Sequence, residues 1–305
     1  MTHNTIDDSE LSNIFSSLQV SFPNSVEDIS YFFSISNKNK NDKVNKIRES
    51  IIESIHLIPS SYTSHQKYCE KWYLVQSEFY KIFNINDSQI NIIKLAGRKY
   101  NYDFILSFSN TTLKIEFKFN CCSIFKLPQI IQISDHTLFR YSYAEFYYDN
   151  YLNNICQELG ISTTIVKDDY LKLVYKTDSK AHLLFQELND CYKTSPVDRK
   201  KIQKTSKESI SAYLQKYYRH LNLSKLSEYL TKALDKTYLL WYKNTFVTQQ
   251  IIDSFKKVNI ISIKNNNTII VQSSYEYCLL LRWKNHIGVL NPCWQISVKE
   301  ISKTK

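Results

Sequence analysis

The sequence predicts a mixed α/β (α+β) protein, and three observations lead to this fold class. A helical pattern over residues 64–83 is followed by three segments of strand character. Further helical segments occur beyond residue 195, and residues 258–298 return to strand character. The chain has 305 residues, of which 43% are hydrophobic, so it is long enough to bury a substantial core. We therefore expect a globular protein that combines helices with sheets.

The first part of the chain predicts helices followed by strands. The strongest helix covers residues 64–83, where Trp72, Val75 and Phe79 recur at spacings of three and four and give one apolar face. Asn110-Thr111-Thr112 predicts the turn of a hairpin. We expect short helices at 9–18 and 44–58, a polar loop at 36–42, and strands at 89–95, 101–108 and 112–119.

The middle of the chain predicts a return to helices. Gly160 is a natural end for a helix over 143–159. Ser195-Pro196 is typical of an N-cap residue followed by proline at the first helical position. We expect helices at 123–134, 143–159 and 223–242, a helix that begins at Pro196, and a strand at 171–175 that closes an α/β unit near residue 190.

The last part of the chain predicts a small antiparallel sheet, with Asn265-Asn266-Asn267 as one of its turns. Its expected strands cover residues 258–264, 268–273, 277–283 and 294–298. The expected organisation is an N-terminal helical region (1–63), an α/β core (64–190) and a helical and β extension (191–305).

Glycine and cysteine usage excludes several kinds of chemistry. Three glycines are too few for a glycine-rich phosphate loop, a dinucleotide fingerprint or a nucleophile elbow. Seven cysteines, an odd number without a Cys-x-x-Cys pair, indicate neither a zinc ribbon nor a disulfide framework. The apolar runs are far shorter than the roughly 18–20 residues that span a bilayer, and the first residues lack a secretory pattern. We expect an intracellular protein of cytoplasm or nucleus, not secreted and without a membrane partner.

The positive charge of the chain is uneven. Its net charge is +10, but residues 191–305 carry 20 Lys and Arg against 7 Asp and Glu. A basic C-terminal third predicts a polyanionic partner such as nucleic acid. The alternative is a lysine-rich surface that serves solubility.

One acid and an acid-lysine pair lie within the apolar strands. Asp103 falls in the second expected strand, and Glu116 and Lys118 fall two residues apart in the third. Residues i and i+2 of a strand point to the same face, and the hairpin would bring Asp103 beside them. Two carboxylates and the backbone carbonyl of Phe117 would suit Mg²⁺ (or Mn²⁺), with Lys118 assisting the attack of water on a phosphodiester. The alternative is an ordinary salt-bridged strand face.

A helix with Glu78 precedes Asp103, and twelve residues separate Asp103 from Glu116-Phe117-Lys118. This pattern resembles the PD-(D/E)XK nuclease superfamily. The resemblance covers about residues 64–180, with Tyr102 in place of the proline of the motif. It implies a restriction-endonuclease-like αβββαβ core and Mg²⁺-dependent cleavage of DNA. It also implies that Asp103 and Glu116 bind metal and Lys118 is catalytic, with Glu78 as a weaker match to a helix acid. Gln129 or Gln132 would contact the phosphate or water, unless it only faces solvent.

Further cations and aromatic residues are candidates for DNA contact. Each set has a structural alternative: solvation of a loop or helix face for the cations, and a place in the core for the tryptophans. The candidates are Arg98, Lys99, Arg199, Lys200, Lys201, Arg282, Trp283, Lys284 and Trp294, with the two tryptophans expected to stack on bases.

The expected function is therefore a Mg²⁺-dependent deoxyribonuclease, an endonuclease that hydrolyses phosphodiester bonds. The alternative is a non-catalytic nucleic-acid-binding protein with a degenerate nuclease fold, and a protein-interaction module is a third possibility. RNA is not excluded as the partner. The sequence leaves the oligomeric state open, a homodimer included.

Overall fold

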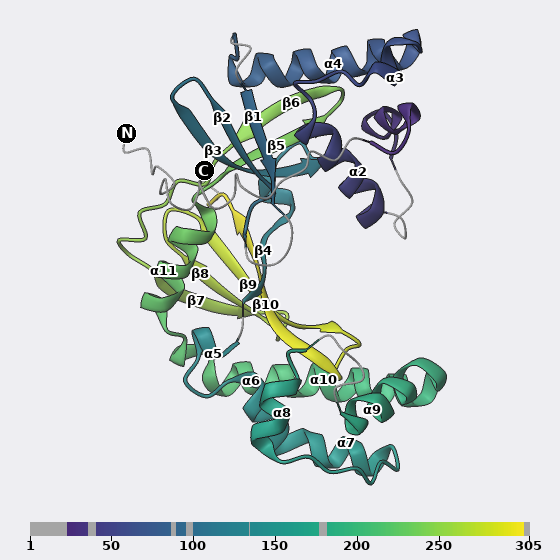
Figure 1. The fold of residues 1–305 in the computed structure, drawn as a ribbon. Helices are drawn as coiled ribbons and strands as arrows, with labels where there is room; N and C mark the ends of the chain where they lie inside the picture. The colour runs from purple at the N-terminus through teal and green to yellow at the C-terminus, as the bar shows by residue number, and fades with distance from the viewer. Residues whose placement is uncertain are drawn as a thin grey trace. The chain divides into compact units, whose positions relative to one another are not determined.

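The computed structural model describes residues 23–35, 41–86, 90–95, 100–133, 135–176 and 182–301. The chain divides into two compact units. Figure 1 colours the chain by residue number, from purple at the N-terminus to yellow at the C-terminus. Unit 1 consists of residues 1–124 and 233–252, and unit 2 of residues 125–232 and 253–305. The chain thus leaves the first unit, builds most of the second and returns, which a division into three consecutive regions (1–63, 64–190 and 191–305) does not describe.

Unit 1 contains a five-stranded mixed sheet in the order β1-β2-β3-β5-β6. Strand β2 is antiparallel to β1 and β3, β3 is parallel to β5, and β5 is antiparallel to β6. The parallel pair joins segments more than a hundred residues apart in the sequence. The strands are β1 (Ile90–Lys94), β2 (Phe104–Phe108), β3 (Thr111–Phe119), β5 (Thr237–Tyr242) and β6 (Thr245–Gln249).

One face of this sheet is covered by the N-terminal helices, with α4 against β6 and α2 against β1 (Figure 1). The alternating residues Phe104, Leu106, Ile115 and Phe117 point to this face and pack into the larger core. Ile105 points to the other face. The helices are η1 (Val26–Phe32), α2 (Asn41–Glu53), α3 (Ser60–Thr63) and α4 (Gln66–Phe83).

Unit 2 contains an antiparallel sheet in the order β4-β10-β9-β8-β7. Asn265 and Asn266 form the β7–β8 turn with positive φ angles of 52° and 57°, which asparagine tolerates better than most residues. The expected turn is therefore confirmed. The strands are β4 (Pro128–Ile133), β7 (Asn259–Lys264), β8 (Thr268–Gln272), β9 (Glu276–Asn285) and β10 (Leu290–Lys299).

The helices of unit 2 pack mainly against α10, which contacts α6, α7 and α9. The hydroxyl of Ser195 accepts the N–H of Asp198 at 3.2 Å, so the expected N-cap before Pro196 is confirmed. The helical segments are η3 (Ile124–Lys126), α5 (Asp135–Leu138), α6 (Tyr143–Tyr147), the π-helical η4 (Tyr148–Leu152), α7 (Asn153–Glu158), α8 (Lys167–Leu173), α9 (Leu183–Thr194), α10 (Pro196–Tyr217), η5 (Tyr218–His220) and α11 (Leu223–Leu234).

The general α+β class is thus confirmed, and three expected elements are wrong. The segment expected as a helix at 123–134 contains strand β4, which is stabilised by pairing with β10. The strand expected at 171–175 lies largely in helix α8. The helix expected over 223–242 stops at Leu234, and its second half is strand β5. The helix expected at 9–18 lies outside the described residues.

Candidate active site in unit 1

The register of β2 and β3 brings the three motif residues together. Phe104 lies opposite Ile115, so Asp103, one residue before β2, lies opposite Glu116. Directly opposed residues of antiparallel strands share a face, and Lys118 follows Glu116 at a spacing of two. The expected convergence of two carboxylates and one ammonium group therefore occurs on a single face of the sheet.

The carboxylate of Asp103 is held by the backbone of β3. The N–H of Asp103 donates to the carbonyl of Ile115 at 2.8 Å, and the N–H of Phe117 donates to Oδ2 of Asp103 at 2.9 Å. The side chain of Asp103, just before the start of β2, thus accepts a hydrogen bond from β3. The backbone fixes the position of this carboxylate relative to Glu116.

Glu116 lies between two lysines. Lys118 forms an ion pair with its Oε1 and Lys236 with its Oε2. Lys236 lies just before β5, its side chain is only 2% exposed, and it also donates to the carbonyl of Asn101. The sequence motif did not indicate Lys236. Only its place directly before the apolar segment that forms β5 could have drawn attention to it.

A second residue that the motif did not indicate is an acid of α2. Glu49 forms an ion pair with Lys94 at 3.6 Å, and it interacts electrostatically with Asp103 and Lys118. Its neighbour Arg48 is fully buried, with its guanidinium 3.3 Å from the ring centroid of Phe119. Arg48 therefore anchors this turn of α2 beside β3 and sets the position of Glu49.

The surroundings shift the pKa values of the cluster in different directions. Burial, opposed by the charge of Lys118, raises the pKa of Asp103, and burial together with the charge of Asp103 raises the pKa of Glu49. Burial would lower the pKa of Lys118, but the carboxylate of Glu116 outweighs it and raises that pKa. For Lys236, burial dominates and lowers the pKa. Opposed shifts within one cluster are common at functional sites.

Tyr238 of β5 is the neighbour of Glu116 in the parallel pairing. Its ring lies 5.3 Å from the ammonium nitrogen of Lys236, and burial raises the pKa of its hydroxyl. Within the described part of the chain, this buried hydroxyl has no hydrogen-bond partner. Tyr238 thus adds an apolar wall and an unsatisfied hydroxyl beside the cluster.

The oxygen donors of the cluster fit a hard cation. The N–H and C=O of a strand residue point to the same side, so the carbonyl of Phe117 lies on the side of β3 where its N–H contacts Asp103. No group of three His, Cys, Asp or Glu side chains arranged to hold a metal occurs among the described residues. Mg²⁺ needs only one or two carboxylates, because it keeps several waters. Lys236 would have to release one oxygen of Glu116 for the ion to bind.

The remaining nuclease candidates lie in other elements or outside the described residues. Glu78 of α4 forms an ion pair with Lys81 at 3.3 Å, so Glu49 is the helix acid that interacts with Asp103. Gln129 belongs to strand β4 of unit 2 rather than to a helix, and its side chain is outside the described residues. Arg98 and Lys99 are also outside them.

Two of the basic residues on α10 have structural contacts. Arg199 donates to the carbonyls of Tyr192 and Lys193 at 2.7 and 2.8 Å, which satisfies the end of α9. Lys201 forms an ion pair with Asp198 at 3.2 Å and donates to the carbonyl of Glu158 at the same distance. Lys200 is exposed. Of the three, Lys200 is the one whose side chain points into solvent.

The cations and tryptophans of the final strands point to opposite faces. Arg282 and Lys284 of β9 are exposed, whereas Trp283 between them is 3% exposed and donates from Nε1 to the hydroxyl of Tyr143 at 3.0 Å. Trp294 of β10 is fully buried. A buried ring has no free face for a base, so the expectation that Trp283 and Trp294 stack on bases is wrong, and both belong to the core.

The charge excess belongs to unit 2. Unit 2 carries 24 Lys and Arg against 15 Asp and Glu, whereas unit 1 carries 15 against 14. In the described part of the chain, no helix combines the length and apolarity that crossing a membrane requires. Comparison of the chain with protein-family models, curated proteins and solved structures finds no match.

Proposed function

We propose that this protein is a metal-dependent nuclease of the PD-(D/E)XK type. The observation that carries the proposal is the pairing of Asp103 opposite Glu116, with Lys118 on the same face and bound to Glu116. The order of unit 1 also supports it, because α4 precedes β1, β2 and β3 as in the first part of the implied core, and β5 pairs parallel with β3.

The proposed substrate is DNA, and the proposed action is endonucleolytic cleavage. The positive charge of unit 2 favours a polyanion, because cationic side chains release the counterions that surround nucleic-acid phosphates. The exposed cations Lys200, Arg282 and Lys284 would contact the phosphate backbone. RNA remains an outcome of the test below.

The residues of the cluster have distinct proposed roles. Asp103, Glu116 and the carbonyl of Phe117 would hold Mg²⁺ or Mn²⁺, which supplies polarisation of the phosphate and a bound water of lowered pKa. Lys118 stays protonated because its pKa is raised. It therefore stabilises negative charge on the phosphoryl oxygens or orients the water, and it does not act as a general base.

A second candidate function is binding of nucleic acid without cleavage. The buried contact of Lys236 with Glu116 favours it, because two ammonium groups already satisfy both oxygens of that carboxylate. If Lys236 never releases Glu116, the cluster is a structural salt-bridge network. The basic surface of unit 2 would then account for the function.

One assay separates these functions. The purified chain is mixed with duplex DNA, single-stranded DNA or RNA, in Mg²⁺ or in EDTA, and the products are separated on gels. Cleavage in Mg²⁺ that stops in EDTA supports the nuclease, and the substrate that is cut defines its class. Binding without cleavage at any Mg²⁺ or Mn²⁺ concentration supports the second candidate. Neither binding nor cleavage contradicts both.

A further inference from the structure

Unit 2 has a pocket lined by aromatic and basic residues. It has a volume of about 280 Å³, and it lies between the segment before α6 and the region where α10 ends and η5 begins. Arg140 and His220 are exposed, and Tyr141 and Tyr217 are half-buried. The residues that line it are Phe139, Arg140, Tyr141, Tyr217 and His220.

The rings of this pocket form a connected aromatic surface. The ring centroids of Tyr141 and Tyr217 are 5.3 Å apart, and those of Tyr217 and His220 are 5.9 Å apart. The ring of Phe139 stacks on the buried ring of Trp294, with centroids 5.4 Å apart and planes 21° apart. Trp294 therefore supports a wall of the pocket from the core, although it offers no face of its own.

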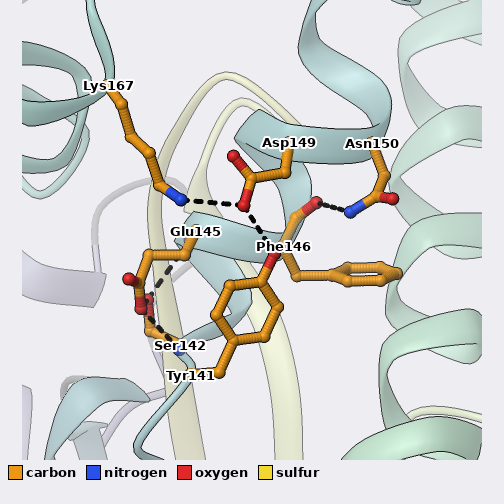
Figure 2. A network of polar contacts seen from close by, with 7 residues as sticks. All are labelled: Tyr141, Ser142, Glu145, Phe146, Asp149, Asn150 and Lys167. Atoms are coloured by element: carbon orange, nitrogen blue, oxygen red, sulfur yellow. Dashed lines mark hydrogen bonds and ion pairs between the residues drawn. The ribbon is translucent and has the colours of Figure 1, made fainter.

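Hydrogen bonds hold Tyr141 in place. Figure 2 shows its hydroxyl pointing to Asp149, to which it donates at 2.7 Å, while the ammonium group of Lys167 contacts the same carboxylate oxygen at 2.8 Å. The hydroxyl of Tyr213 donates to the backbone carbonyl of Tyr141 at 2.7 Å. A ring that is already fixed loses little conformational entropy when a ligand binds.

The helix that carries Asp149 also fits a functional region. Asp149 lies in the π-helical segment η4, and such segments are frequent at functional sites. Desolvation would raise the pKa of Asp149, but the hydrogen bonds from Lys167 and Tyr141 outweigh it and lower that pKa. The carboxylate therefore stays ionised, and these two partners compensate its charge. The other nearby acid, Glu145, accepts from the N–H and hydroxyl of Ser142 at the start of α6.

Cations lie beside the aromatic surface. Arg140 lines the pocket, the ammonium nitrogen of Lys216 lies 5.3 Å from the ring of Tyr217, and Arg219 precedes His220 in η5, with its guanidinium 5.5 Å from the ring of Tyr218. Among the described residues, no ion pair joins Arg140, Lys216 or Arg219 to an acid. Their charges are therefore available to a phosphate.

We propose that this pocket binds an unpaired nucleotide of a single-stranded nucleic acid, with the base against Tyr141 and Tyr217 and the phosphates near Arg140, Lys216 and Arg219. Aromatic faces with surrounding cations are the combination that single strands require, since every base has a π face. The pocket volume is close to the lower end of the roughly 300–1,000 Å³ of small-molecule sites, which suits one base and not a duplex. The site uses none of the residues of the proposed nuclease cluster.

The test measures binding of the full-length chain to a fluorescein-labelled single strand by fluorescence anisotropy in EDTA, where cleavage cannot occur. Tyr217→Leu keeps apolar volume against Phe146 and Tyr213 but removes the π face, and Tyr217→Phe keeps the ring. Tyr73→Leu, at an exposed tyrosine of α4, is the matched control. Stacking contributes about 1–3 kcal/mol per base, so Tyr217→Leu should weaken binding by about 5-fold to 150-fold.

Tyr217→Phe and Tyr73→Leu should bind as the parent does, and the affinity of all variants for blunt duplex should be unchanged. Parallel titrations with DNA and RNA strands show which nucleic acid is preferred. Equal single-strand affinity of Tyr217→Leu and the parent overturns the proposal, and so does an equal loss in Tyr73→Leu. Lys118→Ala should keep single-strand binding even though it loses cleavage, so the two proposals can fail separately.

Discussion

Lys236 provides a quantitative test of the cluster in unit 1, through two substitutions of one ion pair. Glu116→Gln leaves the ammonium group of Lys236, 2% exposed, without a counter-charge, and an uncompensated buried charge costs about 3–5 kcal/mol. Lys236→Met keeps an unbranched chain of similar length, and Glu116 keeps Lys118 as its partner. This change removes charge-assisted hydrogen bonds, but it also removes the unfavourable desolvation of the lysine. We therefore expect a smaller loss in the free energy of unfolding, about 1–3 kcal/mol.

The assay is urea unfolding at neutral pH followed by tryptophan fluorescence, to which Trp72 and Trp241 in unit 1 contribute. The free energy of unfolding should fall in the order parent, Lys236→Met, Glu116→Gln. Lys114→Met is the matched control, because the ion pair of Lys114 with Asp235 at 3.0 Å is more exposed and should contribute less than about 1 kcal/mol. Equal stability of all three variants, or a greater loss in Lys236→Met than in Glu116→Gln, would refute this description of the buried pair.

Two further predictions concern pH. The folded-state pKa of Asp103 is raised, so ionisation of Asp103 destabilises the folded state at neutral pH. Asp103→Asn should therefore abolish cleavage but increase the free energy of unfolding. Urea titrations over a pH series should show that this gain shrinks as the pH falls below the raised pKa. A variant less stable than the parent at neutral pH would contradict the shift. Asp253 has the opposite sign: it accepts hydrogen bonds from Tyr277 at 2.8 Å and from the N–H of Phe255 at 2.9 Å, and these and its bonds to Ser273 and Ser274 lower its pKa in spite of burial. Asp253→Asn should cost about 1–3 kcal/mol at neutral pH and nothing once the pH falls below the folded-state pKa, whereas a pH-independent cost would exclude a role for the charge.

The sequence predicted the local part of the candidate site. Asp103, Glu116 and Lys118 could be placed together because a short turn joins β2 and β3, and the alternation of apolar and polar residues determines which side chains share a face. Ser109, with a positive φ of 49°, forms the actual turn with Asn110, one residue earlier than expected. The observed turn sets the register in which Phe108 lies opposite Thr111, and only this register places Asp103 opposite Glu116. A shift of one residue in the pairing would move Asp103 to the other face of the sheet.

The non-local part of the site was not predictable from these patterns. Strand β5 pairs with β3 from a distant part of the chain, and its sequence from Thr237 to Tyr242 continues an apolar pattern that also suits a helix. Lys236 and Tyr238 reach the cluster only through this pairing. Glu49 reaches it through the packing of α2, which the sequence pattern of a single helix does not specify.

Two errors in unit 2 have different causes. The segment from Pro128 to Ile133 forms a strand because β10 is available as its partner, although its own sequence also allows a helix. The tryptophans of β9 and β10 could be read as exposed because cations flank Trp283. In a strand such neighbours point away from the ring, and the alternation instead indicates a buried ring with exposed cations.

The most direct test of the proposed function compares Lys118→Ala with Lys114→Ala, which changes a lysine on the same face of β3. Cleavage of supercoiled plasmid DNA is measured in Mg²⁺, and DNA affinity is measured in EDTA. We predict that Lys118→Ala lowers the cleavage rate by about 10²–10³-fold with unchanged affinity, as for loss of one group that stabilises transition-state charge, and that Lys114→Ala cuts at the parent rate. Equal cleavage by Lys118→Ala and the parent would contradict the proposed active site.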